Sequence, residues 1–497
     1  MTTPDPDQTH NSHAAVREAQ PKPTKAGPGQ RVNHANAARE FLQSPVHAES
    51  HDERVWAMRQ RRDTAAETIP EWEALRDLAS QIKTHTLSHL DEYLEQFADN
   101  AAENGVHVHW AGDAADHNRI VHEIFQRHGV KKVIKSKSML MEECGFRHYM
   151  DSVGIDIVET DLGERIQQLD NEDPSHVVVP AVHKMRSDVS QVFSKTIGSD
   201  ADNDDAHYLT EQQRQATRPL ILDADAGMTG ANFAVAETGG FVVCTNEGNA
   251  DLSANVPNLH VASIGIEKIV PKLSDMGVFI RLLSRSALGS PITQYTSHFR
   301  KPKDGGEMHI VLVDNGRSER LGSERFWSSL KCIRCGACMN TCPVFRRSGG
   351  LSYGATYTGP LGLILDPSID AYRYSNLPFA STLNGSCTNV CPVKINIHEQ
   401  IFEWRKVLAE DDMLPWTKKS GLNAAGHILS SPKAYRAAIK SAHSALKHLP
   451  DWALYNKLNA WGQERDFPDV PEQGSFHDWY RRHRMAGSAT AATGDDE

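Results

Sequence analysis

The sequence predicts an α/β domain followed by a mainly α-helical domain that is rich in cysteine. Short apolar runs alternate with helical stretches between residues 106 and 179, a pattern typical of βαβ units and a largely parallel sheet. Six of the eight cysteines then fall between residues 332 and 391. We therefore divide the chain into a disordered tail (1–45), an α/β domain with N-terminal helices (46–325), the cysteine-rich domain (326–415) and a helical extension with a polar tail (416–497).

Composition limits the classes of function. With 39% hydrophobic and 24% charged residues, the 497-residue chain is typical of soluble globular proteins. No apolar run approaches the roughly 18 residues of a membrane-spanning helix. The net charge is -11, and no basic block of the kind that binds nucleic acid is present. Because the N-terminal residues lack the apolar segment of a secretory signal and are rich in polar residues, we expect a cytoplasmic protein with a flexible N-terminal tail.

Residues 46–100 have the periodicity of amphipathic helices. Apolar side chains recur there at steps of three and four residues, which places them on one face of a helix. We expect these faces to pack against the α/β domain. The apolar positions are Trp72, Leu75, Leu78 and Ile82 in the first stretch, and Leu87, Leu90, Leu94 and Phe97 in the second.

The α/β domain begins with alternating strands and helices. Its apolar runs predict strands over residues 106–110, 132–134, 155–158 and 177–179, with helices over 117–129 and 139–153 between them. Its second half is richer in strands and glycine. Further strands are expected within residues 231–249, 260–268 and 309–316.

Four polar residues near glycines in that second half are candidates for an active site: Glu237, Asn246, Glu247 and Asn249. Strand ends flanked by glycine present backbone amides that can bind an anion, and open α/β sheets bind ligands beyond the carboxyl ends of their strands. Glu237 is the weak candidate for a catalytic carboxylate. The simpler interpretation is structural, because acidic and amide side chains in such turns often cap backbone amides.

The histidines have no spacing that indicates a metal site. We expect packing or surface roles for His85, His89, His176, His183 and His260.

The cysteine run has the spacing C-x2-C-x2-C-x3-C-P, from Cys332 to Pro343. Thiolates at these steps bind the irons of a 4Fe–4S cluster, while the fourth cysteine of such a run reaches a different cluster. By that crossed pattern Cys332, Cys335, Cys338 and Cys391 hold the first cluster, and Cys342 belongs to the second. A structural zinc site, which needs only four tetrahedral ligands, is the alternative.

A helix is expected just after the second cysteine run, over residues 395–410. Its apolar face would pack over the cluster and exclude water, which is one determinant of reduction potential. That face carries Ile397, Ile401, Trp404 and Leu408.

Several longer motifs are spread along the chain. They are Lys135-Ser-Lys-Ser-Met139, Glu159-Thr-Asp-Leu-Gly-Glu164, Pro174-Ser-His176, Thr229-Gly-Ala-Asn-Phe-Ala-Val-Ala-Glu-Thr-Gly239, Thr245-Asn-Glu-Gly-Asn249, Asp314-Asn-Gly-Arg-Ser318 and Ser352-Tyr-Gly-Ala-Thr-Tyr-Thr-Gly-Pro360. Together they resemble the lactate-utilisation protein B family, whose members join a LUD domain to a ferredoxin-type iron–sulfur domain. The resemblance implies an α/β fold akin to the coenzyme A transferase and sugar isomerase superfamily. It also implies an iron–sulfur subunit that acts with two partner subunits to oxidise L-lactate to pyruvate.

The second cluster site departs from the family pattern. Family members usually have a cysteine at the position of Asn384, so only Cys342 and Cys387 remain as thiolate ligands there. An amide oxygen is a harder and weaker donor to iron than a thiolate. The second cluster is then absent, labile, or completed by Asn384, Ser381 or an outside group.

Two functions remain open from the sequence. In the first, the chain transfers electrons within an L-lactate-oxidising complex and is not catalytic alone. No G-x-G-x-x-G fingerprint of a flavin or nicotinamide site is present, so partner subunits and an electron acceptor, which the sequence does not identify, are required. In the second, the α/β domain is a transferase- or ligase-like enzyme or a ligand sensor, and the cluster is structural.

Overall fold

The computed structural model describes residues 29–456, 459, 461–462, 465–470 and 475–485. The chain forms two compact units, Met1–Asp411 and Asp412–Glu497. The predicted disorder of residues 1–28 and of the last dozen residues concerns positions outside the described ones.

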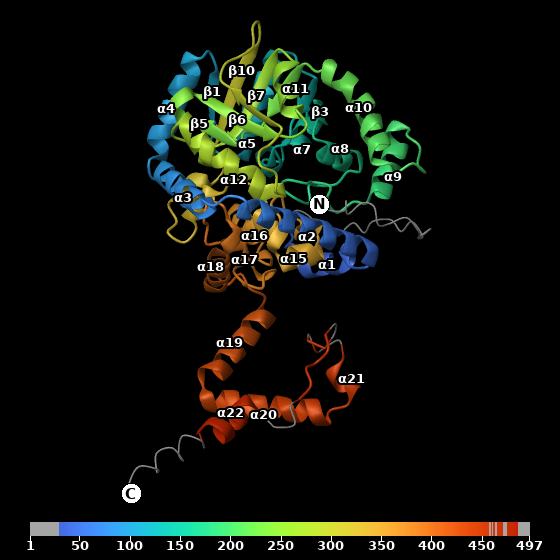
Figure 1. Ribbon diagram of the computed structural model, residues 1–497, viewed down its shortest axis with the longest axis vertical. Helices are drawn as coiled ribbons and strands as arrows, with labels where there is room; N and C mark the ends of the chain where they lie inside the picture. Colours follow the sequence, from blue (N-terminus) through green and yellow to red (C-terminus); the bar gives the residue numbers. More distant parts are fainter. Residues whose placement is uncertain (1–28, 457–458, 460, 463–464, 471–474, 486–497) are drawn as a thin grey trace. The chain divides into compact units, whose positions relative to one another are not determined.

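A six-stranded parallel sheet forms the centre of the first unit (Figure 1). The predicted strands over 106–110, 132–134 and 155–158 are confirmed as its members, within one residue at each end. The strand order is β1 (His107–Ala111), β10 (Glu307–Val313), β7 (Leu259–Gly265), β4 (Ala226–Thr229), β2 (Lys132–Lys135) and β3 (Asp156–Glu159).

Helices connect these strands. The single helix expected over 139–153 is instead two helices, because Gly145 between them has a φ of 61°, which an α-helix does not tolerate. The helices are α5 (Ala114–Arg127), α6 (Met139–Glu143), α7 (Phe146–Ser152), α8 (Leu162–Leu169), α9 (Arg186–Ile197), α10 (Ala206–Leu222), α11 (Asn249–Asn255), α12 (Met276–Leu288) and α13 (Arg317–Leu321).

A second, four-stranded sheet lies beside the first and supplies the glycine-rich turns. Its order is β8 (Ile269–Val270), β5 (Phe233–Val235), β6 (Gly240–Thr245) and β9 (Tyr295–Phe299). Gly239, in the β5–β6 turn, has a φ of 61°, and a side chain there would meet the backbone nitrogen of Ala101 at 2.2 Å. The turn therefore needs glycine because it packs directly on α4 (Leu90–Glu103).

The N-terminal helices α2 (Pro45–Glu67), α3 (Trp72–Ser88) and α4 bury most of the predicted apolar positions, including Leu87, Leu90, Leu94 and Phe97. Leu78 is the exception. It is 44% exposed, and Ala79 takes the buried place on α3.

Two expectations about local structure are wrong. Residues 34–41, assigned to the disordered tail, form the helix α1 (His34–Phe41), in which Phe41 is 1% exposed. Residues 177–179, expected as a strand, form a loop whose amides at Val178 and Val179 donate to Nδ1 of His176. In both places, packing against the cysteine region determines the structure, and the local sequence pattern does not.

The cysteine region shares one hydrophobic core with the α/β domain, since Phe279 and Leu282 of α12 belong to the same buried cluster as Cys338 and Met339. The predicted helix over 395–410 is confirmed as α18, with Ile397, Ile401, Trp404 and Leu408 buried. The α-helices of the region are α14 (Ala337–Thr341), α15 (Pro343–Ser348), α16 (Gly359–Ile369), α17 (Ser386–Val390) and α18 (Ile397–Glu410).

The second unit contains the helices α19 (Trp416–Ser430), α20 (Pro432–His448), α21 (Asp451–Leu454) and α22 (Phe476–Tyr480). Among the described residues of these four helices, none is buried. In the part of the chain that the structure describes, no helix has both the length and the apolar character needed to cross a membrane.

Candidate iron–sulfur centre

Two copies of one local structure carry the cysteines. In the first, Gly336 with a φ of 77° precedes the five-residue helix α14, and in the second Gly385 with a φ of 79° precedes the five-residue helix α17. Each helix ends at a cysteine with extended backbone, Cys342 or Cys391, and proline follows. The copies pair Asn384 with Cys335, so the asparagine occupies the position of a cluster cysteine in the repeated fold.

Cations from the N-terminal helices hold the second cysteine run in place. The Arg62 guanidinium of α2 donates to the carbonyl oxygen of Val390 at 3.2 Å, and that of Arg76 on α3 donates to the carbonyl oxygen of Cys391 at 2.9 Å. These contacts place positive charge beside the thiolates. A cluster with four thiolate ligands carries net negative charge, which such cations stabilise.

The thiols of the two predicted groups lie near one another. Burial raises the pKa of the Cys338 thiol, and the nearby charges of Cys332, Cys335, Cys387 and Cys391 raise it further. Burial also raises the pKa of Cys387 to about 11, and the charges of Cys342 and Cys391 add to this rise. The division into one group of four thiols and one of two, and their assignment as ligands, therefore stays a prediction.

The distances between the cysteine sulfurs distinguish a zinc site from a cluster site. Tetrahedral zinc binds thiolates at about 2.3 Å, which brings the sulfurs to about 3.8 Å from one another. In the described part of the chain, which includes all eight cysteines, no three cysteine sulfurs lie within 4.8 Å of one another. The described cysteines therefore lack the close sulfur packing of a preformed tetrahedral zinc site, and the choice of a cluster rests on the ferredoxin-type spacing of the sequence.

Backbone amides point at several of these sulfurs. The N–H of Arg334 donates to Sγ of Cys332 at 3.4 Å, and that of Ile395 donates to Sγ of Cys391 at 3.3 Å. Hydrogen bonds to ligand sulfur are one determinant of a cluster's reduction potential. The residues present therefore fit an iron–sulfur cluster in both spacing and surroundings.

The second group lacks comparable donors to iron. Oδ1 of Asn384 accepts the N–H of Ser386 at 3.0 Å, and Oγ of Ser381 accepts the N–H of Leu383 at 3.1 Å. Cys335 accepts the equivalent N–H of Ala337 in its own copy, so Asn384 keeps the turn but replaces sulfur with oxygen. Cys342 and Cys387 remain as the thiols of this group.

Comparisons with known proteins agree with this architecture. The LUD domain family matches residues 94–320, and the 4Fe-4S dicluster domain family matches residues 328–395. Lactate utilization protein B 2 of Bacillus mycoides (strain KBAB4) is 40% identical over 434 residues, which cover 85% of this chain and 91% of that protein. Lactate utilization protein B of Bacillus cereus (strain B4264) has the same identity and coverage.

The chain belongs to the lactate utilization protein B family. The resemblance noted in the sequence is thereby confirmed, as is the order of an α/β LUD domain followed by an iron–sulfur domain. A solved DUF162 family protein from Deinococcus radiodurans aligns with 45% of this chain and 98% of its own, at 14% identity and a TM-score of 0.25.

The LUD part of this family member brings together three of its four predicted site residues. Asn246, Glu247 and Asn249 line a cavity of about 500 Å³. Glu237 is exposed and is not among the lining residues, and its carboxylate accepts the N–H of Leu273 at 2.8 Å. That contact is the capping role considered for it from the sequence.

All five predicted structural histidines have protein partners. His176 contacts Oδ1 of Asn340, His183 contacts Glu172, and His260 contacts Oγ1 of Thr229, at 2.9–3.1 Å. His85 contacts the hydroxyl of Tyr93 at 2.9 Å, and His89 contacts the carbonyl oxygen of His85 at 3.0 Å. In the described residues the group spaced for a metal ion is a different one, His128, Glu307 and His309.

Sequence reasoning missed several residues around the cavity. Lys137 lies within the motif Lys135-Ser-Lys-Ser-Met139 and Arg334 within the first cysteine run, but neither is among the predicted site residues. Lys268 and Glu267 follow β7 and also line the cavity. These residues share one feature in the sequence, since each is a charged residue in or next to a motif. The strand order of the sheet then brings them close together.

Proposed function

We propose that this chain is an iron–sulfur electron-transfer subunit of a multi-subunit system that oxidises L-lactate to pyruvate. The observation that carries the proposal is the repeated cysteine structure with ferredoxin-type spacing, which is supplied with amide donors and nearby cations. Membership of a family whose relatives are named for lactate utilization supports the substrate. A cluster at this position would supply one-electron redox chemistry.

We propose one complete 4Fe–4S cluster, held by Cys332, Cys335, Cys338 and Cys391. The chain's own part is to hold the thiolates, donate amide hydrogens to sulfur and exclude water with α18. Cys342 and Cys387 would bind a second cluster only with help at the position of Asn384. The match to a dicluster family supports a second site but leaves its occupancy to experiment.

The electron count supports partner subunits. Oxidation of one L-lactate to pyruvate releases two electrons and two protons, whereas a single 4Fe–4S cluster passes electrons one at a time. We therefore propose that two partner subunits supply the dehydrogenating chemistry and that an electron acceptor receives the electrons. This proposal also includes a cytoplasmic location and the kinship of the LUD fold to coenzyme A transferases. It includes domain boundaries at residues 45, 325 and 415.

Two matched substitutions test the function. In cells that depend on this chain for growth on L-lactate, we expect Cys335→Ser to abolish growth and to lower the iron and sulfide content of the purified protein. Glu237→Gln should leave both unchanged, as should Cys144→Ser, which removes a buried thiol outside the two groups.

The opposite result would favour the alternative function. If Glu237→Gln stops growth while Cys335→Ser does not, the α/β domain is the transferase- or ligase-like or ligand-sensing part and the cluster is structural. Stoichiometric zinc in place of iron and sulfide in the wild-type protein would reject the electron-transfer proposal.

A further inference from the structure

The cavity of the LUD domain reaches the first cysteine group. Its walls include Cys335 and Arg334 from the cysteine run, and residues that follow β2, β6 and β7 of the two sheets. The volume of about 500 Å³ lies within the range of small-molecule binding sites. A molecule bound here would therefore lie against the first cluster.

Three polar oxygens in the cavity wall have no hydrogen-bond partner among the described residues. They are Oγ of Ser136, Oγ1 of Thr245 and Oδ1 of Asn249. Ser136 is only 2% exposed and Asn249 only 5%. Each of these three atoms exposes less than 1 Å², so they make the wall polar behind its surface but offer a ligand no accessible hydrogen-bonding atom.

Two lysines in the same wall also lack partners. Lys137 and Lys268 are half-buried, and in the part of the chain that the structure describes neither ammonium group has a hydrogen bond or an ion pair. Burial lowers the pKa of Lys137, which means that its charged form is poorly solvated where it lies. A half-buried ammonium group is stabilised by an anion brought close to it.

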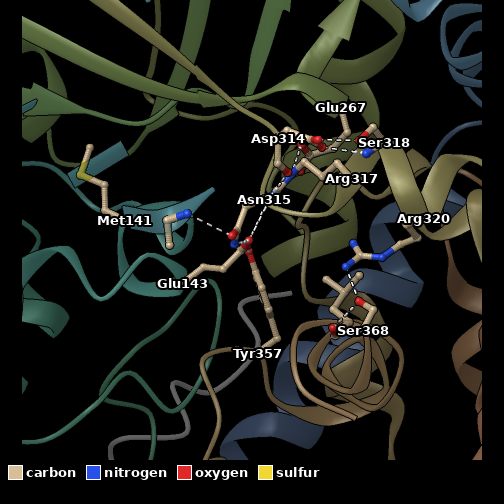
Figure 2. Close-up of polar contacts among 12 residues, drawn as sticks. Met141, Glu143, Glu267, Asp314, Asn315, Arg317, Ser318, Arg320, Tyr357 and Ser368 are labelled. Carbon is tan, nitrogen blue, oxygen red and sulfur yellow. Dashed lines mark hydrogen bonds and ion pairs between the residues drawn. The ribbon is translucent and has the colours of Figure 1, made fainter. Parts of the chain in front are cut away.

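The arginines of the wall, in contrast, are already paired. Figure 2 shows Arg317 between Glu143 and Glu267, with 2.9 and 2.6 Å between the charged atoms. Tyr357 also donates to Glu143, and Arg334 pairs with Glu267 at 3.4 Å. This network fixes the wall and leaves the two lysines as the cations available to a ligand.

The charge of the lining limits the charge of the ligand. Four cationic and three carboxylate side chains line the cavity, and Glu143, which pairs with Arg317, brings the formal charge of the wall to zero. A monocarboxylate adds one negative charge to this balanced wall, whereas a phosphate would add two charges beside Asp161 and Glu247. The remaining wall is largely apolar, with Val177, Val178 and Leu283 among its residues, and it suits a ligand with a hydrocarbon part.

We propose that this cavity binds a small organic monocarboxylate, with its carboxylate at Lys137 and Lys268 and its body against the wall that contains Cys335. This inference goes beyond the proposed function, because anion binding can be measured whether or not electrons pass through the chain.

Calorimetric titration of the full-length protein, purified with its clusters under anaerobic conditions, tests the proposal. The probes are L-lactate, pyruvate, L-2-hydroxyhexanoate and inorganic phosphate. We expect at least one carboxylate to bind more tightly than phosphate, and its affinity to fall at least tenfold in Lys137→Met and in Lys268→Met. The exposed Lys301→Met is the matched control and should bind like the wild type.

A second measurement tests the position of the ligand. Binding of the carboxylate should change the electron paramagnetic resonance spectrum of the reduced protein, since the site borders Cys335. The iron content of each variant is measured first. Lys137→Met is the decisive variant because its segment, after β2, contains no cysteine of either group.

Three outcomes would overturn the proposal: no carboxylate binds to the wild-type protein, both lysine variants bind as tightly as the wild type, or phosphate binds more tightly than every carboxylate. If Cys335→Ser abolishes growth on L-lactate but the wild-type protein fails in this titration, the proposed function stands. The proposed ligand of the cavity is then rejected.

Discussion

One residue distinguishes the two copies of the repeated cysteine structure. Cys335 and Asn384 occupy equivalent turns, each accepting an amide hydrogen from two residues further along. The fold thus tolerates oxygen in place of sulfur, because the turn needs only an acceptor. Iron discriminates more strongly, since it prefers thiolate to an amide oxygen.

Asn384→Cys should therefore raise the iron and sulfide content per chain, because it restores a thiolate beside Cys342 and Cys387. Spin counting by electron paramagnetic resonance, before and after reduction with dithionite, would detect the added centre. Asn389→Cys is the control, since this exposed asparagine lies on the same short helix. Equal iron content in the wild type and in Asn384→Cys would show that Asn384 does not limit the second site.

At the scale of elements, the helix α1 joins the chain's N-terminal part to the cysteine region. The ring of Phe41 lies over Gly349, where an added Cβ would meet it at 3.1 Å, and His34 contacts Oγ of Ser348. Asn33 caps the helix by accepting the N–H of Asn36. A short helix is marginal alone, so these tertiary contacts are what stabilise it.

Removal of the Phe41 ring should destabilise the region around the clusters. We expect Phe41→Ala to cost about 3–5 kcal/mol, as is usual for a fully buried phenylalanine, and to speed iron release in urea. Phe402→Ala on α18 removes a ring that is 48% exposed, and it should change stability by less than about 0.5 kcal/mol. Similar urea midpoints for the two variants would mean that α1 does not support the cysteine region.

Individual elements also show where the sequence predicts the structure and where it does not. Strands β1, β2 and β3 are predictable from their short apolar runs, and the buried face of α18 from apolar residues at helical spacing. Residues 177–179 are as apolar as a strand, but they pack as a loop against the cysteine region, where a Cβ added at Gly336 would meet Val178 at 3.2 Å. The assignment of Cys332, Cys335, Cys338 and Cys391 to one cluster rests on spacing alone and stays a prediction. The cavity does not follow from spacing, because Lys137, Lys268 and Arg334 come together only through the order of strands in the sheet.

Across the whole first unit, several histidines are buried and neutral. Burial lowers the pKa of His34, His51 and His117 to about 4, and that of His176 and His260 to about 3. In the unfolded chain the same groups titrate near 6.5. Between pH 6.5 and about 4 the unfolded state binds more protons, so stability falls as the pH falls through that window.

For each of these histidines with a pKa near 4, the free energy of unfolding should fall by about 2 kcal/mol as the pH falls from 7 to 5. We expect the urea midpoint to fall steeply over that interval, well above the pH at which carboxylates titrate. His117→Asn should flatten the dependence, whereas the exposed His148→Asn should leave it as in the wild type. A midpoint that is constant from pH 7 to pH 5 would contradict the prediction.

Cys335 belongs at once to the first thiol group and to the wall of the LUD cavity. An anion in the cavity and an added electron on the cluster would repel each other across this shared wall. By thermodynamic linkage, a bound carboxylate would lower the cluster's reduction potential, and reduction would weaken carboxylate binding by the same factor. Arrival of an electron would then favour release of the anion, so that occupancy of the cavity would report the redox state of the chain.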